Sequence, residues 1–235
     1  MQGTRICLRK ASDHMHPFGI TNRRFLLLCL LGLGALALPA LGCSLGSGTS
    51  TGTSTPAATA TPNLVIYKDA LDGSTKSDWA DDSNCFFGAG GYHIKASFIC
   101  YAPSDKVGDG VITVSVTQLS GPVTHAYGLV FRRPSQGNYY EFLVDSNGKW
   151  IFDKVVSGTT THLVDFTANA AIVSGLNKVN TLSVQAQGSH FVFSVNGTQV
   201  GTADDTTFTT GDTGLSGNDG IEVVFTNLLI SKLSS

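Results

Sequence analysis

Three residues near the middle of the chain have side chains that could bind a ligand together. The apolar residues of segment 127–131 alternate with smaller ones, and this period of two is typical of a half-buried strand. If the apolar side chains point inward, Arg132 points outward, and the same alternation leaves Tyr139 and Glu141 exposed outside the next strand. An exposed aromatic ring beside a guanidinium and a carboxylate suits stacking on a sugar ring and hydrogen bonding to its hydroxyl groups. The alternative is an ordinary cross-strand ion pair between Arg132 and Glu141, with Tyr139 as its apolar neighbour.

Hydrolysis of a glycosidic bond would require a second carboxylate close to Glu141. The two carboxyl groups must lie about 5 to 5.5 Å apart for retention, or about 6.5 to 9.5 Å apart for inversion. Asp145 shares a strand face with Glu141, but four residues of extended chain separate them by about 13 Å. An Asp on another strand remains an open possibility. The only other glutamate is Glu222, and no Gly-x-Ser-x-Gly motif is present, so the sequence favours a protein without catalytic activity.

The first 42 residues are organised like an export signal. Arg23 and Arg24 form a positive segment, residues 25–38 form an apolar run, and residues 40–42 supply the small side chains that a signal peptidase requires. We therefore predict that residues 1–42 are a signal peptide and that the rest of the chain is exported.

Two properties of this leader stay open in the sequence. The segment before the paired arginines is long and polar for a signal peptide, so translation could begin at Met1 or at Met15. The paired arginines and the apolar residues after them also resemble a twin-arginine export signal, although Asn22 replaces the usual Ser or Thr.

Cys43 directly follows the predicted cleavage site. This arrangement resembles the lipobox of bacterial lipoproteins, in which the cysteine is acylated and becomes the new N-terminus, although Ala40 replaces the preferred Leu. The resemblance implies an extracytoplasmic protein anchored to the cell membrane by lipidated Cys43. One alternative is cleavage without lipidation, which would give a secreted protein. The other is an uncleaved N-terminal membrane anchor over residues 25–45, which contain no charged residue.

Two cysteines remain for the exported domain. Cys7 and Cys29 belong to the leader and Cys43 is the lipidation candidate, which leaves Cys85 and Cys100 as an even pair. Exported proteins oxidise such pairs, and the intervening residues are typical of a strand, a glycine turn and a strand. The sequence therefore predicts a disulfide, with two buried free thiols as the alternative.

The composition divides the remaining chain into a linker and one domain. Residues 43–62 are rich in Ser, Thr and Gly, which predicts a disordered tether because such a segment buries little apolar surface. Residues 63–235 are long enough for a single domain with a sizeable core. From residue 44 onward, 10 Lys and Arg stand against 16 Asp and Glu, so a nucleic-acid partner is not expected.

The domain shows a strand pattern almost throughout. Segments 112–116, 127–131, 140–144 and 182–195 all alternate with a period of two, and we find no amphipathic helix after Cys43. Asn196-Gly197 between two such segments is a strong hairpin signal. The fold class predicted from this pattern is all-β, an antiparallel β-sandwich or jelly roll.

Three segments carry a more specific resemblance. Residues 180–197, 208–215 and 223–230 resemble the C-terminal half of concanavalin A-like, laminin-G-like jelly rolls, near the bacterial branch that includes 3-keto-disaccharide hydrolase-type domains. Residues 127–132 and 138–142 and the stretch ending at Trp79 also fit this family. Thr226 stands where relatives often have Asp, and the E-x-D-x-x-E strand of the family's glucanases is absent. The resemblance therefore implies the fold but leaves the activity open.

Calcium is the one cofactor that the sequence leaves open. Asp69, Asp72, Asp81 and Asp82 are oxygen donors of the kind that Ca²⁺ prefers, and jelly rolls of this type often carry structural calcium. Clustered Asp residues in loops also arise from turn chemistry alone. We therefore assign no metal ligands and expect no other cofactor.

Taken together, these patterns predict a membrane-tethered lipoprotein with a non-catalytic jelly-roll domain. The expected partners are the membrane, through the lipid anchor, and a glycan or another surface polymer, through Arg132, Tyr139 and Glu141. One alternative is a hydrolase or lyase of the same fold that acts on glycosides. The other is a structural or protein-interaction module of the cell envelope.

Overall fold

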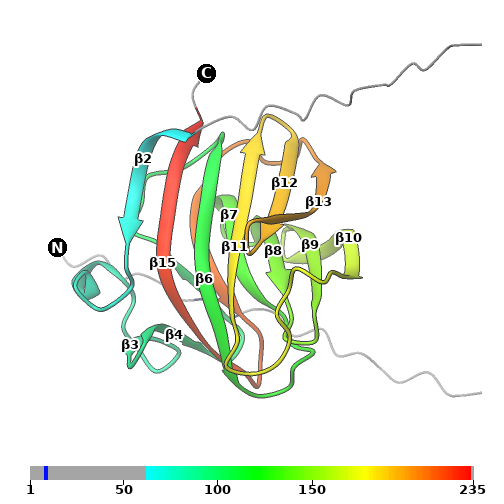
Figure 1. Ribbon diagram of the computed structural model, residues 1–235. Coiled ribbons are helices and arrows are strands. Elements are labelled where there is room, and N and C mark those ends of the chain that lie inside the picture. Colours follow the sequence, from blue (N-terminus) through cyan, green and yellow to red (C-terminus); the bar gives the residue numbers. More distant parts are fainter. Residues whose placement is uncertain (1–7, 10–61, 234–235) are drawn as a thin grey trace, which may run out of the picture. The chain divides into compact units, whose positions relative to one another are not determined.

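The computed structural model describes residues 8–9 and 62–233. Two antiparallel sheets account for all the described strands (Figure 1). The predicted signal peptide, Cys43 and the linker lie outside the described residues, apart from the two-residue strand β1. The one helix described is the 3₁₀ turn η1 (Lys76–Asp78), and no described helix is long and apolar enough to cross a bilayer.

Sheet A has seven strands. In spatial order they are β1 (Leu8–Arg9), β5 (Phe98–Tyr101), β14 (Asp212–Gly217), β7 (Tyr127–Ser135), β8 (Asn138–Val144), β9 (Lys149–Val156) and β10 (Thr159–Ala168).

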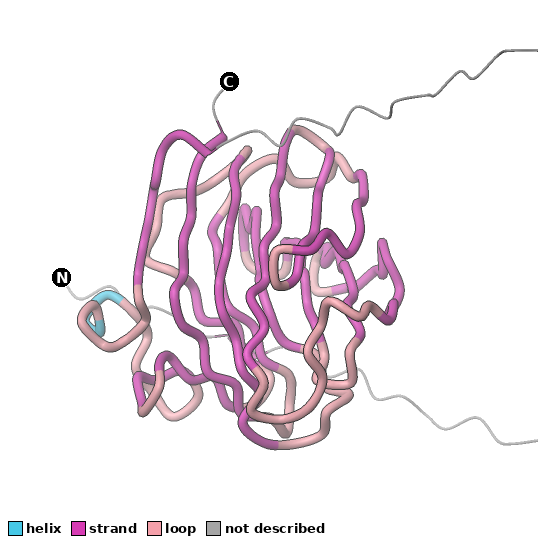
Figure 2. The backbone as a smooth tube through the Cα atoms, in the orientation of Figure 1, coloured by secondary structure: helices cyan, strands magenta, loops and turns pink. Residues whose placement is uncertain are grey.

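Sheet B has eight strands. In spatial order they are β13 (Thr198–Asp204), β12 (His190–Val195), β11 (Val179–Gln187), β6 (Gly110–Ser120), β15 (Glu222–Leu233), β4 (Gly91–Lys95) and β3 (Cys85–Gly88), and β2 (Pro62–Asp69) pairs with the second half of β15. Figures 1 and 2 show these long strands side by side, joined by short loops.

The period-two alternation follows from burial between the two sheets. On β6 the buried residues Ile112, Val114 and Val116 alternate with partly exposed ones. They face an aromatic layer in which rings from sheet A contact rings from sheet B, among them Phe152 and Phe193 with centroids 4.6 Å apart. Every residue of this main core lies between residues 71 and 230, so the described domain contains the whole core.

The predicted hairpin turn is confirmed. Asn196 and Gly197 have φ values of 52° and 79° and connect β12 to β13, as expected for a two-residue hairpin turn that needs positive φ at both positions. Trp79 and Trp150 are buried in the main core. Gly201 lies so close to Trp150 that a Cβ atom there would come within 2.4 Å of the indole ring.

The predicted disulfide is confirmed and joins the two sheets. Cys85 lies on β3 of sheet B and Cys100 lies on β5 of sheet A, with their Cα atoms 6.3 Å apart. The segment between them forms the expected hairpin, β3 and β4, but Cys100 belongs to the strand that follows it. The covalent bond therefore connects the two layers at one side of the sandwich.

Candidate functional site on the outer face of sheet A

The strands of sheet A have one face toward the main core and one face away from it. On β8, Tyr140, Phe142 and Val144 belong to the main core, which confirms the expected inward side of this strand. Tyr139, by contrast, packs in a separate small cluster with Ile99, Val130 and Val155. Because side chains alternate along a strand, Glu141 shares this outer face with Tyr139, but it is fully buried there and not exposed as predicted.

The register of β8 and β9 places a second carboxylate beside Glu141. Asp153 is the direct cross-strand partner of Glu141, and such partners have Cβ atoms about 4.5 to 5.5 Å apart. Ser216 Oγ lies 3.3 Å from Glu141 Oε1, and His162 Nδ1 lies 2.7 Å from Asp153 Oδ1. The two carboxylates, both buried, thus form an acidic centre on the outer face.

Tyr139 adjoins this acidic centre. The sequence predicted an exposed ring, but only 7% of Tyr139 is exposed, so this expectation is wrong. Burial, followed by the negative charge of Glu141, raises the pKa of the Tyr139 hydroxyl well above its usual value. The charges of Tyr101 and Asp153 raise this pKa further and that of Arg133 lowers it, and Tyr101 packs against the same small cluster as Tyr139.

Arg132 does not lie on the outer face, so the expectation that it binds a ligand there is wrong. Its side chain has an exposed fraction of 2%. The guanidinium donates hydrogen bonds to the carbonyl oxygens of Gly108, Gly188 and Phe208 and to Asp109, and it lies 5.0 Å from the centroid of the Phe191 ring. Arg132 therefore connects loops and strands at the edge of the core.

A break in the strand register explains this error. The pairing of β7 with β8 shifts between Phe131 and Ser135, and Arg132 has a φ of 47°, in the left-handed region. A bulge of this kind adds residues to one strand and redirects the side chains that follow. Arg133 is consequently the arginine on the outer face, where its Cζ lies 4.2 Å from the centroid of the Tyr101 ring and its Nη1 lies 3.1 Å from Asp212 Oδ2.

We refer to five residues of this face as the outer-face cluster: Tyr101, Arg133, Tyr139, Glu141 and Asp153. Only Tyr139 and Glu141 were identified from the sequence. The sequence could have identified Asp153 as the partner of Glu141. β8 and β9 flank a short turn around Asn147-Gly148, so residues at equal distances from this turn face each other across the two strands. Arg133 and Tyr101 could not be identified in this way. Arg133 reaches the outer face only because of the bulge in β7, and Tyr101 lies on β5, which pairs with the distant strand β14.

The aspartates considered for calcium are scattered. Asp69 accepts hydrogen bonds from the side chains of Tyr67, Thr75 and Trp79 and from the backbone N–H of Leu71. Asp72, Asp81 and Asp82 lie in turns, where Asp82 accepts two backbone N–H groups and Asp81 forms an ion pair with Lys76. The described part of the chain contains no group of three or more His, Cys, Asp or Glu residues that could hold a metal ion.

Comparisons with known proteins establish the fold. No protein-family model matches the chain, and no curated protein matches it. Among solved structures, the carbohydrate-binding module CBM66 from Bacillus subtilis is 21% identical, with 72% of this chain and 97% of that chain covered and a TM-score of 0.55.

Two further solved structures show the same likeness. A protein of unknown function with a galectin-like fold, also from Bacillus subtilis, is 14% identical, with 74% and 98% covered and a TM-score of 0.58. The Bacillus licheniformis β-glucanase is 12% identical, with 71% and 98% covered and a TM-score of 0.52. The predicted concanavalin A-like jelly roll is therefore confirmed.

Proposed function

We propose that this chain is a membrane-tethered extracytoplasmic lipoprotein whose jelly-roll domain binds a glycan without cleaving it. The observation that carries the proposal is the outer-face cluster itself. Within this cluster the Tyr101 ring and the Arg133 guanidinium stay partly exposed beside the buried Tyr139, Glu141 and Asp153, and an aromatic ring next to a planar donor suits the hydroxyl-bearing surface of a sugar. The fold is also that of solved carbohydrate-binding and glycoside-processing proteins.

The proposal concerns the mature chain, which the sequence predicts to begin at Cys43. After lipidation, residues 44–61 would link the membrane surface to the first strand of the domain. A flexible tether of this length has a root-mean-square span of roughly 25 Å. Such a span leaves the domain free to reach polymers in the cell envelope.

Glycoside hydrolysis is the second candidate, and one observation favours it. Asp145 is not the partner of Glu141, because it accepts the backbone N–H groups of Asn147 and Lys149 in the turn after β8. Asp153 takes that place instead, and cross-strand neighbours about 4.5 to 5.5 Å apart at Cβ come close to the carboxyl spacing of retaining enzymes. A glycan held at this face would therefore meet two carboxylates.

A paired binding and turnover experiment separates these functions. Residues 43–235 are applied to a glycan array, and every glycan retained is then incubated with the protein and assayed for released reducing ends. Binding without release supports the binding module, and release supports the hydrolase. The absence of both would instead support a structural or protein-interaction module of the envelope.

A further inference from the structure

Two consecutive arginines of β7 reach opposite sides of sheet A. Arg132 points to the edge of the core and Arg133 lies on the outer face. The left-handed backbone of Arg132, with a φ of 47°, makes this arrangement possible. Non-glycine residues adopt this conformation rarely, and it persists only where the surrounding structure imposes it.

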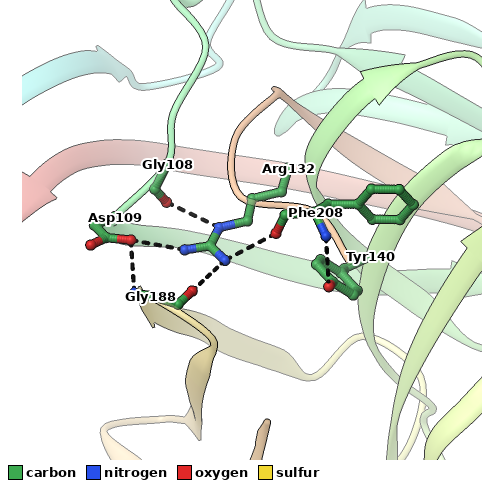
Figure 3. A network of polar contacts seen from close by, with 6 residues as sticks. All are labelled: Gly108, Asp109, Arg132, Tyr140, Gly188 and Phe208. Atoms are coloured by element: carbon green, nitrogen blue, oxygen red, sulfur yellow. Dashed lines mark hydrogen bonds and ion pairs between the residues drawn. The ribbon is translucent and has the colours of Figure 1, made fainter. Parts of the chain in front are cut away.

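Arg132 is held by contacts on every side of its guanidinium. Three carbonyl oxygens and the Asp109 carboxylate accept its hydrogen bonds at 2.7 to 3.2 Å (Figure 3). These acceptors come from the segment before β6, the β11–β12 turn and the segment before β14. The side chain thus ties three separate parts of the domain to one strained backbone position.

Gly211 supports the next residue from the other side. A Cβ atom at Gly211 would lie 2.2 to 2.4 Å from the backbone N, C and O atoms of Arg133, so only glycine allows this close approach. Two neighbouring features, the contacts of Arg132 and the backbone contact of Gly211, therefore fix the position from which the Arg133 side chain emerges.

Arg133 is only partly satisfied by the residues around it. Its Nη1 forms an ion pair with Asp212, and its guanidinium lies over the Tyr101 ring. Its Nε is buried and has no hydrogen-bond partner among the described residues. A buried donor without an acceptor is unfavourable, so a ligand oxygen at this position would relieve the penalty.

We propose that Arg133 is the specificity-determining residue of the outer-face cluster, that Arg132 positions it, and that the preferred ligand is an uncharged glycan. This inference rests on the proposed glycan-binding function. Asp212 already balances the charge of Arg133, which then hydrogen-bonds a neutral hydroxyl or carbonyl oxygen of the sugar. A carboxylated sugar would have to compete with the Asp212 carboxylate that already pairs with Arg133.

The test uses residues 43–235, which contain the whole core, and four soluble probes: a mixed-linkage β-glucan, xylan, a chitin hexasaccharide and polygalacturonate. Affinities are measured by isothermal titration and thermal stability is measured in parallel. Arg133→Lys keeps the charge but loses the planar donor, and we expect at least a tenfold weaker affinity for the neutral probe that binds, with an unchanged melting temperature. Lys178→Gln, on an exposed loop, is the control and should bind normally.

The positioning role has its own measurement. Arg132→Lys should weaken binding in the otherwise unchanged protein but should have no further effect when Arg133→Lys is already present. A purely structural role would give additive losses in the double variant. Gly211→Ala should weaken binding in the same non-additive way.

The outcomes separate this inference from the proposed function. Binding of a neutral probe that Arg133→Lys leaves intact would overturn the inference while the binding function stands. Preference for polygalacturonate would overturn the uncharged ligand class. If the wild-type protein binds none of the four probes and nothing on the array, the proposed function fails and the inference fails with it.

Discussion

Glu141 on β8 and Asp153 on β9 are direct cross-strand partners on the outer face of sheet A. Like charges opposite one another destabilise a sheet unless neighbouring groups compensate them. The neighbouring Ser216 and His162 each contact one of the two carboxylates. A retaining hydrolase would need both carboxylates of this pair, whereas a binding module would not.

Glu141→Gln should weaken glycan affinity about tenfold, because a charged acceptor of sugar hydroxyl groups becomes a weaker neutral one. The matched control is Glu222→Gln, the same change at the other glutamate, which pairs with His93 and Lys95 in sheet B and should leave affinity unchanged. Titration of both variants against the array-selected glycan checks this. Equal affinities in the two variants would remove Glu141 from the site.

Cys43→Ala should abolish lipidation and shift the protein from the membrane fraction toward unprocessed precursor. Intact-mass spectrometry of the wild-type protein should show an acylated N-terminal cysteine at residue 43. A mature chain that begins at another residue, or a precursor that remains embedded in the membrane, would contradict the predicted anchor.

Loss of the bond between Cys85 and Cys100 should destabilise the domain. The bond closes a loop with a sequence separation of 15, for which the chain-entropy estimate is about 3 kcal/mol. Calorimetry with and without reductant should show a lower melting temperature after reduction. Detection of both thiols by alkylation of the oxidised native protein would refute the bridge.

Phe142→Ala should cost about 3 to 5 kcal/mol of unfolding free energy, because the ring is fully buried between the sheets. Phe166→Ala on β10 is the control, since that ring is 45% exposed and its loss should change stability by less than about 0.5 kcal/mol. Urea unfolding of the two variants measures the difference. Similar losses would mean that the assigned faces of β8 are wrong.

Acid should weaken a contact between the two sheets at Asp205. Burial alone would raise the pKa of this carboxyl group, but hydrogen bonds from Lys154, Thr207 and Tyr140 outweigh burial and hold the pKa well below its usual range. A carboxyl with a lowered pKa in the folded state stabilises the protein above about pH 4, and this stability is lost as the pH falls toward the folded-state value. Asp205→Asn should therefore lower stability at pH 7 and flatten its dependence below pH 4. An unchanged pH profile would contradict this role.

The fold class was predictable because strands and tight turns leave short-range patterns in the sequence. Alternation identified the strands that line the core, and Asn196-Gly197 identified a hairpin. The site was only half predictable, because Tyr139 and Glu141 obey the alternation whereas Arg132 and Arg133 do not. A bulge moves the side chains that follow it to the opposite face of the strand, and the residue types around position 132 do not indicate a bulge.

The last described strand, β15, has the most partners in sheet B. It pairs with β2, β4 and β6. The edge of each of these three earlier strands that faces β15 therefore has no partner until residues 222–233 have been synthesised. A nascent chain with this strand order cannot close its core while it is still being synthesised, because its longest-range contacts form last. We therefore expect sheet B to be completed only after residues 222–233 have left the ribosome.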